Sequence, residues 1–165
     1  MKMKNQIVIS SLSAIVIACL LFSSCKKDNE EDQIINWADL CQLEAVVTKT
    51  IIYGQTPEGL RGDIYFEGPV TGDSINGYMT GIDYYLSRAE EPDKVNAHAT
   101  IVTDDSALIT VYITGFGYDD GTIQDDIVSF ESGNTKYKWL NETQLTGSGY
   151  NVTDSTFLIN YYFAK

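Results

Sequence analysis

Residues 97–115 of the chain read AHATIVTDDSALITVYITG, and this stretch decides the fold class. Its second half alternates between aliphatic and hydroxyl-bearing side chains, in the order Ile109, Thr110, Val111, Tyr112, Ile113 and Thr114. Successive side chains of a β-strand point to opposite faces, so the alternation indicates a strand with one buried face. The residues between the two halves, Asp104, Asp105 and Ser106, favour a turn. The stretch therefore predicts a β-hairpin.

The same two-residue period returns along the rest of the chain. At its end, one face of a predicted closing strand carries Phe157, Ile159, Tyr161 and Phe163. Further strands are predicted at residues 43–53, 62–66, 77–86, 122–130, 136–140 and 144–148, and a short helix is compatible with residues 88–96 or 39–46. Short connections between about eight or nine strands favour an up-and-down barrel, because a Greek-key sandwich needs longer crossings. We expect an all-β fold, a small antiparallel β-barrel, with a two-sheet β-sandwich as the alternative.

The first 24 residues have the layout of a secretory signal. Lys2 and Lys4 precede an apolar run over residues 7–22, and two serines follow it. As a helix the run would be about 24 Å long, shorter than the ~30 Å hydrocarbon core of a bilayer. A removable signal peptide over residues 1–24 is therefore a better interpretation than a permanent transmembrane helix.

Cys25 follows these serines directly and resembles the cysteine of the lipobox in bacterial lipoproteins. In that family signal peptidase II cuts before the cysteine, whose sulfur receives diacylglycerol and whose new amino group is usually acylated. The resemblance implies a membrane protein anchored by palmitate-type chains on Cys25. Phe22 stands where Leu is usual, as in the looser boxes of Bacteroidota, and Cys19 is the alternative site. Cleavage there would expose the apolar residues 20–22, whereas Cys25 leads into the polar stretch KKDNEED.

Residues 26–36 are charged and carry no sustained apolar pattern. They predict a flexible acidic spacer, so that the lipidated cysteine and spacer occupy residues 25–36 and a single β domain occupies residues 37–165. This layout resembles small Bacteroidota lipoproteins with lipocalin-like (calycin-like) domains, and the resemblance implies a lipocalin-like barrel. It concerns layout alone, because the Gly-x-Trp motif of lipocalins is absent before Trp37.

The acidic residues of the spacer bear on location. Asp28, Glu30, Glu31 and Asp32 resemble the acidic tract of lipoproteins that Bacteroidota ship to the cell surface, although two lysines separate them from Cys25. The resemblance implies a lipid-anchored protein of the outer membrane that is exposed on the cell surface. A periplasm-facing position on the same membrane is the alternative.

The composition excludes several kinds of partner. Cleavage after residue 24 would remove two of the 11 basic residues and none of the 23 acidic ones, leaving a net charge of −14. Nucleic acids and anionic lipids need clusters of Lys and Arg, so neither is an expected partner, and the membrane is reached through the lipid anchor. Cys41 is the one cysteine left in the domain, which excludes an intrachain disulfide and indicates a small buried hydrophobe.

The sequence lacks the motifs of the common enzyme classes. It holds one histidine, His98, and no HExxH, CxxC or phosphate-binding loop. No catalytic residue and no cofactor other than the covalent lipid are therefore predicted. A pair of carboxylates is the remaining route to catalysis, because glycoside hydrolysis needs only two acids at a set separation. The acids that could form such a pair are Glu67, Asp83, Asp125, Asp126 and Glu131, and solvated turns are the competing interpretation.

Two sets of residues are candidate ligand sites. Four carboxylates gather around one turn and could bind calcium, although their spacing departs from that of an EF-hand: Asp119, Asp120, Asp125 and Asp126. An ordinary acidic turn is the alternative. Aromatic side chains with polar tips suit a ligand cavity or a sugar-stacking surface, with core packing as the alternative. The candidates are Tyr84, Tyr85, Tyr112, Tyr118, Tyr137 and Trp139.

Three serines are candidate modification sites. Ser74, Ser106 and Ser155 each follow an aspartate and precede Ile, Ala or Thr. These tripeptides resemble the O-glycosylation acceptor of exported Bacteroidota proteins, and turns are also rich in Asp and Ser for reasons of backbone geometry.

These observations favour a monomeric binding or interaction module. Its ligand would be a glycan, an apolar small molecule or another envelope protein. A small carboxylate-dependent hydrolase or isomerase is one alternative, and a structural envelope component without a ligand is the other. An aromatic-lined pocket would favour binding, converging acids with raised pKa values would favour catalysis, and a barrel filled by side chains would favour a structural role.

Overall fold

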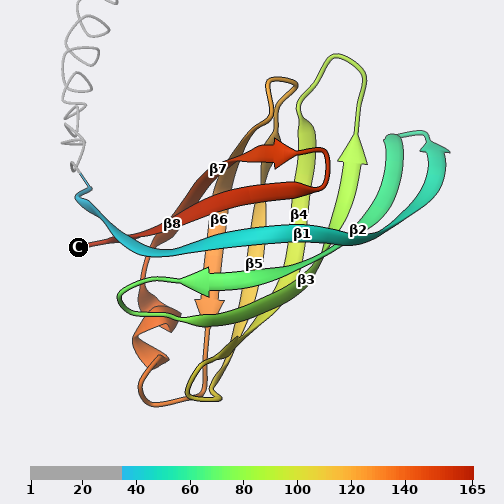
Figure 1. The fold of residues 1–165 in the computed structure, drawn as a ribbon. Helices are drawn as coiled ribbons and strands as arrows, with labels where there is room; N and C mark the ends of the chain where they lie inside the picture. Colours follow the sequence, from blue (N-terminus) through green and yellow to red (C-terminus); the bar gives the residue numbers. More distant parts are fainter. Residues whose placement is uncertain (1–34) are drawn as a thin grey trace, which may run out of the picture. The chain divides into compact units, whose positions relative to one another are not determined.

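The computed structural model describes residues 35–165, apart from the side chain of Asp126, and they form eight antiparallel strands that close into a barrel (Figure 1). The strands are β1 (Trp37–Thr56), β2 (Gly59–Thr71), β3 (Gly77–Ser87), β4 (Asp93–Thr103), β5 (Leu108–Gly117), β6 (Thr122–Glu131), β7 (Leu145–Thr153) and β8 (Thr156–Ala164). The predicted signal peptide, the lipidation site Cys25 and most of the spacer lie outside the described residues.

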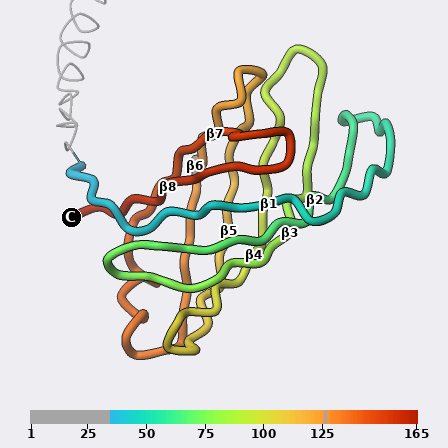
Figure 2. The backbone as a smooth tube through the Cα atoms, in the orientation of Figure 1, coloured from blue at the N-terminus to red at the C-terminus, as the bar shows by residue number. Residues whose placement is uncertain are grey.

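Each strand pairs with the next along the chain, and β8 returns to pair with β1. Figure 2 shows these two strands running side by side at the point where the barrel closes. The prediction of an all-β barrel is confirmed, and the sandwich alternative is wrong. The hairpin of residues 97–115 is also confirmed, since Ile101 of β4 pairs with Ile109 of β5.

One end of the barrel, here called the packed end, is filled by side chains. It holds the start of β1, the connections at residues 72–76 and 104–107, and the long connection at residues 132–144. The fully buried side chains near it are large and mostly aliphatic: Leu40, Val70, Ile75, Met79, Ile101, Ile109, Phe130 and Leu140. Burial of this apolar surface supplies the main driving force for closing the sheet.

The long connection contains the 3-10 helix η2 (Lys138–Glu142), where the sequence suggested a strand over residues 136–140. Tyr137 and Leu140 are both buried and lie three residues apart, which matches the three-residue turn of a 3-10 helix rather than a strand. The side chain of Asn134 accepts the backbone N–H of Lys136 at 3.0 Å and starts the turn. No helix between residues 35 and 165 is long and apolar enough to cross a membrane.

The two stretches compatible with a short helix are not helical. Residues 39–46 belong to β1, and residues 88–96 form a turn followed by the start of β4. In β1 the β-branched residues Val46, Val47 and Thr48 favour an extended backbone. Pro92 lacks a backbone N–H and restricts the residue before it, so it separates the turn from β4.

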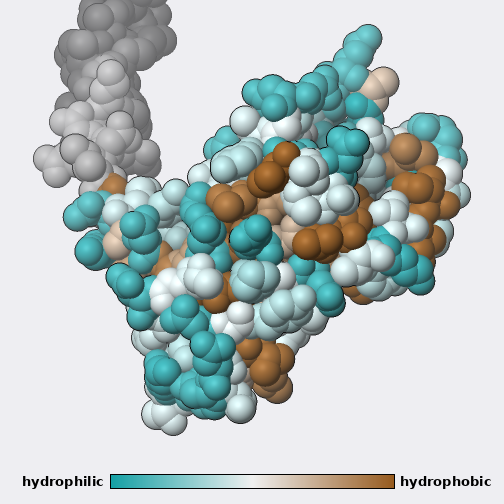
Figure 3. Space-filling view, viewed as in Figure 1, coloured by the Kyte–Doolittle hydropathy of each residue, from teal (hydrophilic) through white to brown (hydrophobic). Residues whose placement is uncertain are grey.

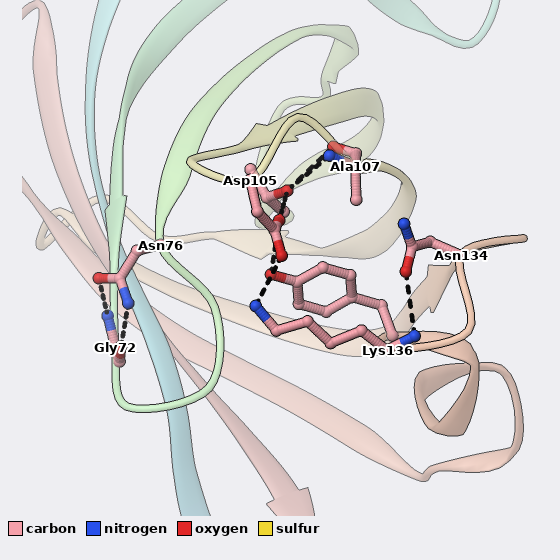
Figure 4. A network of polar contacts seen from close by, with 8 residues as sticks. Gly72, Asn76, Asp105, Ala107, Asn134 and Lys136 are labelled. Atoms are coloured by element: carbon pink, nitrogen blue, oxygen red, sulfur yellow. Dashed lines mark hydrogen bonds and ion pairs between the residues drawn. The ribbon is translucent and has the colours of Figure 1, made fainter.

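A polar network ties the β4–β5 turn to the long connection at the packed end (Figure 4). The carboxylate of Asp105 accepts hydrogen bonds from Lys136 Nζ at 2.7 Å, from Thr103 Oγ1 at 2.5 Å and from the Tyr137 hydroxyl at 3.1 Å. The Lys136 ammonium, followed by the Thr103 hydroxyl, holds the pKa of this carboxyl well below its usual range. The network fixes the covering segment over the buried side chains below it.

The β1–β2 hairpin extends past the rest of the barrel. β1 pairs with β8 only as far as Val46, and residues 49–56 pair with β2 alone among the described strands. Ile52 and Tyr53 in this extension are 55% and 64% exposed. Figure 3 shows hydrophobic residues gathered over this hairpin. Residues 49–56 of β1 therefore have an edge that no described strand pairs with.

Candidate functional site

The end opposite the packed end, here called the open end, holds a cavity of about 320 Å³. It lies below the turns at residues 88–92, 118–121 and 154–155, and side chains from all eight strands line it. More than half of the lining is aliphatic or phenylalanine: Leu43, Val47, Ile64, Phe66, Val95, Ala97, Ile113, Ile123, Phe157 and Ile159. The barrel is thus filled by its own side chains at one end and hollow at the other.

The polar groups of the lining are acids, tyrosines and one amide: Asp83, Tyr85, Asp93, Tyr118, Asp125, Asn151, Asp154 and Tyr161. None of the described residues that line the cavity is Lys, Arg or His. A cavity with apolar walls and a few polar groups is the usual form of a small-molecule site.

Asp83 is a half-buried carboxyl on β3. Its Oδ1 accepts the backbone N–H of Asn96 from the neighbouring strand β4 at 2.8 Å. Desolvation raises the pKa of Asp83 to about 6, against the lowering effect of that hydrogen bond. The negative charges of Asp63 and Asp93 add to the rise. This carboxyl can therefore exist in either protonation state near neutral pH.

Asp93 lies at the start of β4 and is held by Tyr85. The Tyr85 hydroxyl donates a hydrogen bond to Asp93 Oδ2 at 2.5 Å. Desolvation, followed by this hydrogen bond, raises the pKa of Tyr85 above its usual value. Since Asp93 also contributes to the pKa of Asp83, the two carboxyls and the phenol form one group at the cavity.

Asp125 on β6 is buried more deeply, with 3% of its surface exposed, and lies beside the buried ring of Tyr161. Gly147 on β7 leaves room for both. A Cβ atom at residue 147 would lie 2.6 Å from Asp125 Oδ2 and 3.0 Å from the Tyr161 ring. Burial raises the pKa of Tyr161 well above its usual range, and Asp125 raises it further. Tyr161 is therefore a neutral hydrogen-bonding group at the cavity wall.

A second hollow of about 500 Å³, here called the vestibule, lies next to the cavity and shares Asp93 and Tyr118 with it. Its other charged residues are Arg88, Glu90, Glu91, Asp119 and Asp120. Arg88 forms an ion pair with Glu91, so most of the remaining charge is negative. The vestibule and the cavity together present an acidic entrance that leads to an apolar interior.

The predicted aromatic residues fall into three places. Tyr85 and Tyr118 line the cavity, as proposed for a ligand site. Tyr84 and Tyr112 lie on the outer face of the barrel, where their rings flank His98 with centroid distances of 5.5 and 4.6 Å. Tyr137 and Trp139 belong to the segment over the packed end, and the Trp139 ring stands edge-on to Phe163. The outer pair and the packed-end pair are therefore not brought together with the cavity tyrosines.

The four acids of the proposed calcium site do not share one surface. Asp125 faces the cavity, whereas Asp119 and Asp120 line the vestibule. The side chain of Asp126 is not among the described ones. Asp120 is engaged by Thr122, whose N–H and hydroxyl donate to it at 2.9 and 2.7 Å. No group of three or more His, Cys, Asp or Glu residues within the described part of the chain could hold a metal ion.

The remaining candidates lie at the surface or outside the cavity lining. Glu67 and Glu131 are absent from the lining, so among the paired acids considered from the sequence Asp83 and Asp125 alone are seen to reach it. Ser74, Ser106 and Ser155 are all exposed in connections between strands. Cys41 is buried as expected, and burial raises the pKa of its thiol to about 12.

Four polar residues of the cavity were not predicted from the sequence as site residues: Asp93, Asn151, Asp154 and Tyr161. Tyr161 could have been predicted. It lies in the predicted closing strand on the same face as Phe157 and Ile159, and that face points into the barrel. A polar tip at an inward position of a barrel strand marks a cavity wall. Asp93 and Asp154 lie at or beside turns, where acids are common, so the sequence gives no sign that they converge.

Comparison with known proteins bears on the fold alone. Neither a protein-family model nor a curated protein matches this chain in sequence. Among solved structures it is similar to a beta-barrel-like protein from Acinetobacter baumannii AYE, with a TM-score of 0.70 and 21% identity over 79% of this chain and 96% of that one. A conserved protein of unknown function from Rhodopseudomonas palustris has a TM-score of 0.69 and 21% identity over 79% of this chain and 98% of that one.

An enzyme from Penicillium herquei is also similar, with a TM-score of 0.60 and 22% identity over 79% of this chain and 95% of that one. At such identities the likeness shows that the closed barrel recurs in other proteins and leaves the ligand open. The chemistry of this barrel therefore depends on the residues of its own cavity.

Proposed function

We propose that this protein is a lipid-anchored protein of the outer membrane, exposed at the cell surface, whose barrel binds one small organic molecule. The location rests on the sequence around Cys25. The binding function rests on one observation, the apolar cavity of about 320 Å³ at the open end. Its size is at the lower end of small-molecule sites, which favours a compact ligand over a polysaccharide chain or an envelope protein.

The division of the barrel into a filled and a hollow half supports this choice. A purely structural barrel of this size would gain stability from side chains that fill its whole interior, because each void forfeits packing contacts. Here the lining includes the small residues Ala97 and Gly117 and several acids, all of which give up packing energy. A ligand that covers the apolar wall would recover part of that energy on binding.

A fragment screen tests the binding function. Full-length protein in maltoside micelles is titrated with soluble fluorinated fragments, and binding is followed by ¹⁹F NMR line broadening, with empty micelles as the blank. Ile113→Trp places a large ring in the cavity, and Thr114→Trp places the same ring on the outer face of β5 as a control. We expect fragments whose binding is lost in the first variant and kept in the second. The function is wrong if every hit binds both variants equally.

A second candidate function is acid–base catalysis by proton transfer, as in an isomerase or hydrolase. Asp83 favours it, because a carboxyl with a pKa of about 6 beside an apolar cavity can accept and return a proton near neutral pH. One structural neighbour is described as an enzyme, so the fold is compatible with catalysis. Fragments with protons next to a carbonyl group should then exchange them with D₂O in the native protein and not in Asp83→Asn. Equal exchange in both proteins would exclude this role for Asp83.

A further inference from the structure

The charges around the cavity have one sign. Four carboxyls belong to its lining, and no Lys, Arg or His does among the described residues. The vestibule adds four more acids of its own, while its single arginine is paired with Glu91. A low-dielectric hollow lined by one sign of charge concentrates the opposite charge in its mouth. The entrance is therefore selective for cations before any contact is made.

Two of the cavity acids, Asp83 and Asp93, are half-buried and have uncharged hydrogen-bond partners. Asp83 has an N–H of the backbone as its hydrogen-bond partner, and Asp93 has a phenol. Within residues 35–165 no ion pair includes either of them. Desolvation is the main cause of the raised pKa of Asp83, so the charged form of this carboxyl is poorly solvated. A cation at this place would satisfy both carboxylates.

Apolar walls decide what kind of cation fits. A metal ion needs several oxygen, nitrogen or sulfur ligands around one point, and no described cluster of acids, cysteines or histidine supplies them. The cavity instead offers aliphatic side chains and Phe157 beside the acids. This combination matches an ammonium group attached to an apolar body.

We propose that the molecule bound in the barrel is an organic amine, whose ammonium group lies between Asp83 and Asp93 while its apolar part contacts the cavity wall. The inference rests on the binding function proposed above and names its ligand class. Asp83 and Asp93 supply the charge, Tyr85 orients Asp93, and the acidic vestibule raises the local concentration of the cation.

Amine binding should depend on pH in a defined direction. The charged groups that act on Asp83 are Asp63 from β2 and Asp93 from β4, and Tyr85 lies on its own strand at the same cavity. An ammonium group favours the ionised form of Asp83 and so lowers its pKa in the complex. Binding then releases a proton below about pH 6 and strengthens as the pH rises through that value, with little change above it.

Three fluorinated probes of one shape test the inference: 4-fluorophenethylamine, 2-(4-fluorophenyl)ethanol and 4-fluorophenylacetate. Their affinities for the full-length protein are measured by ¹⁹F NMR at pH 7.5, with empty micelles as the blank. We expect the amine to bind about tenfold more tightly than the alcohol, a difference that corresponds to one charged contact. The acid should bind most weakly of the three. Asp83→Asn should remove most of the advantage of the amine and leave the alcohol unchanged.

Two controls separate this contact from other effects. Asp104→Asn removes the same charge from an exposed turn at the packed end, and it should leave the affinity of the amine unchanged. Asp93→Asn repeats the test if Asp83→Asn does not fold. Equal binding of amine and alcohol, both lost in Ile113→Trp, would overturn the amine and keep the cavity site. Binding of no probe, or equal binding to Ile113→Trp, would overturn the amine together with the cavity site.

Discussion

Gly147 on β7 lies against the Asp125 carboxylate and the Tyr161 ring, and there is no room for a methyl group between them. A Cβ atom there would lie 2.6 Å from Asp125 Oδ2, closer than real Cβ contacts allow. Gly147→Ala should therefore lower the free energy of unfolding by about 1–3 kcal/mol, because the cavity wall must shift. The measurement is the midpoint of urea unfolding.

Gly133→Ala is the matched control, since a Cβ atom at residue 133 meets nothing within 4 Å. This variant should change stability by no more than about 0.5 kcal/mol in either direction. Equal midpoints for Gly147→Ala and the native protein would show that the wall around Asp125 is loose.

Cys41 provides a second test for a single residue. The thiol is buried, and burial raises its pKa to about 12, so almost no thiolate exists at neutral pH. Native protein treated with iodoacetamide at pH 8 should remain unmodified at Cys41, whereas protein in guanidinium should react. Mass spectrometry of the peptide that contains Cys41 gives the result. Rapid modification of the native protein would contradict the inert, packed role of this side chain.

Among the elements, η2 and the segment before it depend on one carboxylate at the neighbouring turn. Asp105 has a depressed pKa because Lys136 and Thr103 stabilise its charged form. A carboxyl of this kind contributes stability above the pKa it has in the unfolded chain, about 3.9, and loses that contribution as the pH falls below it. The site is exposed, so the effect is modest.

Asp105→Asn should lower the melting temperature at pH 7, and the difference from the native protein should shrink as the pH falls below about 4. Differential scanning calorimetry across this range gives the measurement. A difference that stays constant down to pH 3 would mean that shape rather than charge makes the turn stable.

The extension of β1 is an element with an edge that no described strand pairs with. Residues 49–56 pair with β2 on one side and with no described strand on the other. Lys49 is exposed there, and its Nζ atom lies 5.2 Å from the centre of the Tyr65 ring. Lysines on free edges oppose the pairing of strands from different molecules. Bulges on either side of residues 49–52 twist this edge further.

Lys49→Val should therefore increase self-association, seen as light scattering that rises with protein concentration. The control is Lys94→Val on β4, where the strand is paired with β3 and β5. This second variant loses the same charge without freeing an edge. If both variants stayed equally monodisperse, the lysine would have no protective role.

The strands were predictable because each repeats a two-residue period, as β4, β5 and β8 show most clearly. The segment at residues 136–140 was not, because Tyr137 and Trp139 also fit an alternating pattern. Its structure depends on the hydrogen bond that the Lys136 N–H donates to Asn134 Oδ1 and on the one that the Tyr137 hydroxyl donates to Asp105. Asp105 lies 32 residues before Tyr137 in the sequence, so a local pattern cannot predict this contact.

At the scale of the whole molecule, barrel closure could be expected from short hairpins, but the contents of the barrel could not. Asp83 and Asp125 stood among the acids considered from the sequence, and they meet in the cavity lining only because the sheet closes. Asp93 and Asp154 come from turns that are distant in sequence. The two-residue period predicts which side chains share a face of a strand. Which side chains of different strands meet inside the barrel depends on the strand register and the shear of the barrel.

The proposed lipid anchor concerns the whole chain and has a direct test. Cys25→Ser should leave a larger, unprocessed precursor in the cell, because in bacterial lipoproteins the thiol of this cysteine is the group that would receive the lipid. Mass spectrometry of the mature protein should find the acyl chains on Cys25. Lipid on Cys19 would contradict the chosen cleavage site, and a soluble mature protein without lipid would contradict the anchor itself.

The first strand enters the barrel at its packed end, since Trp37 pairs with Ala164 there, and the cavity opens at the other end. Within the described residues the packed end is closed by buried side chains, so a guest molecule would enter and leave through the same mouth at the open end. Its release would then depend on the turns that frame this mouth, at residues 88–92, 118–121 and 154–155.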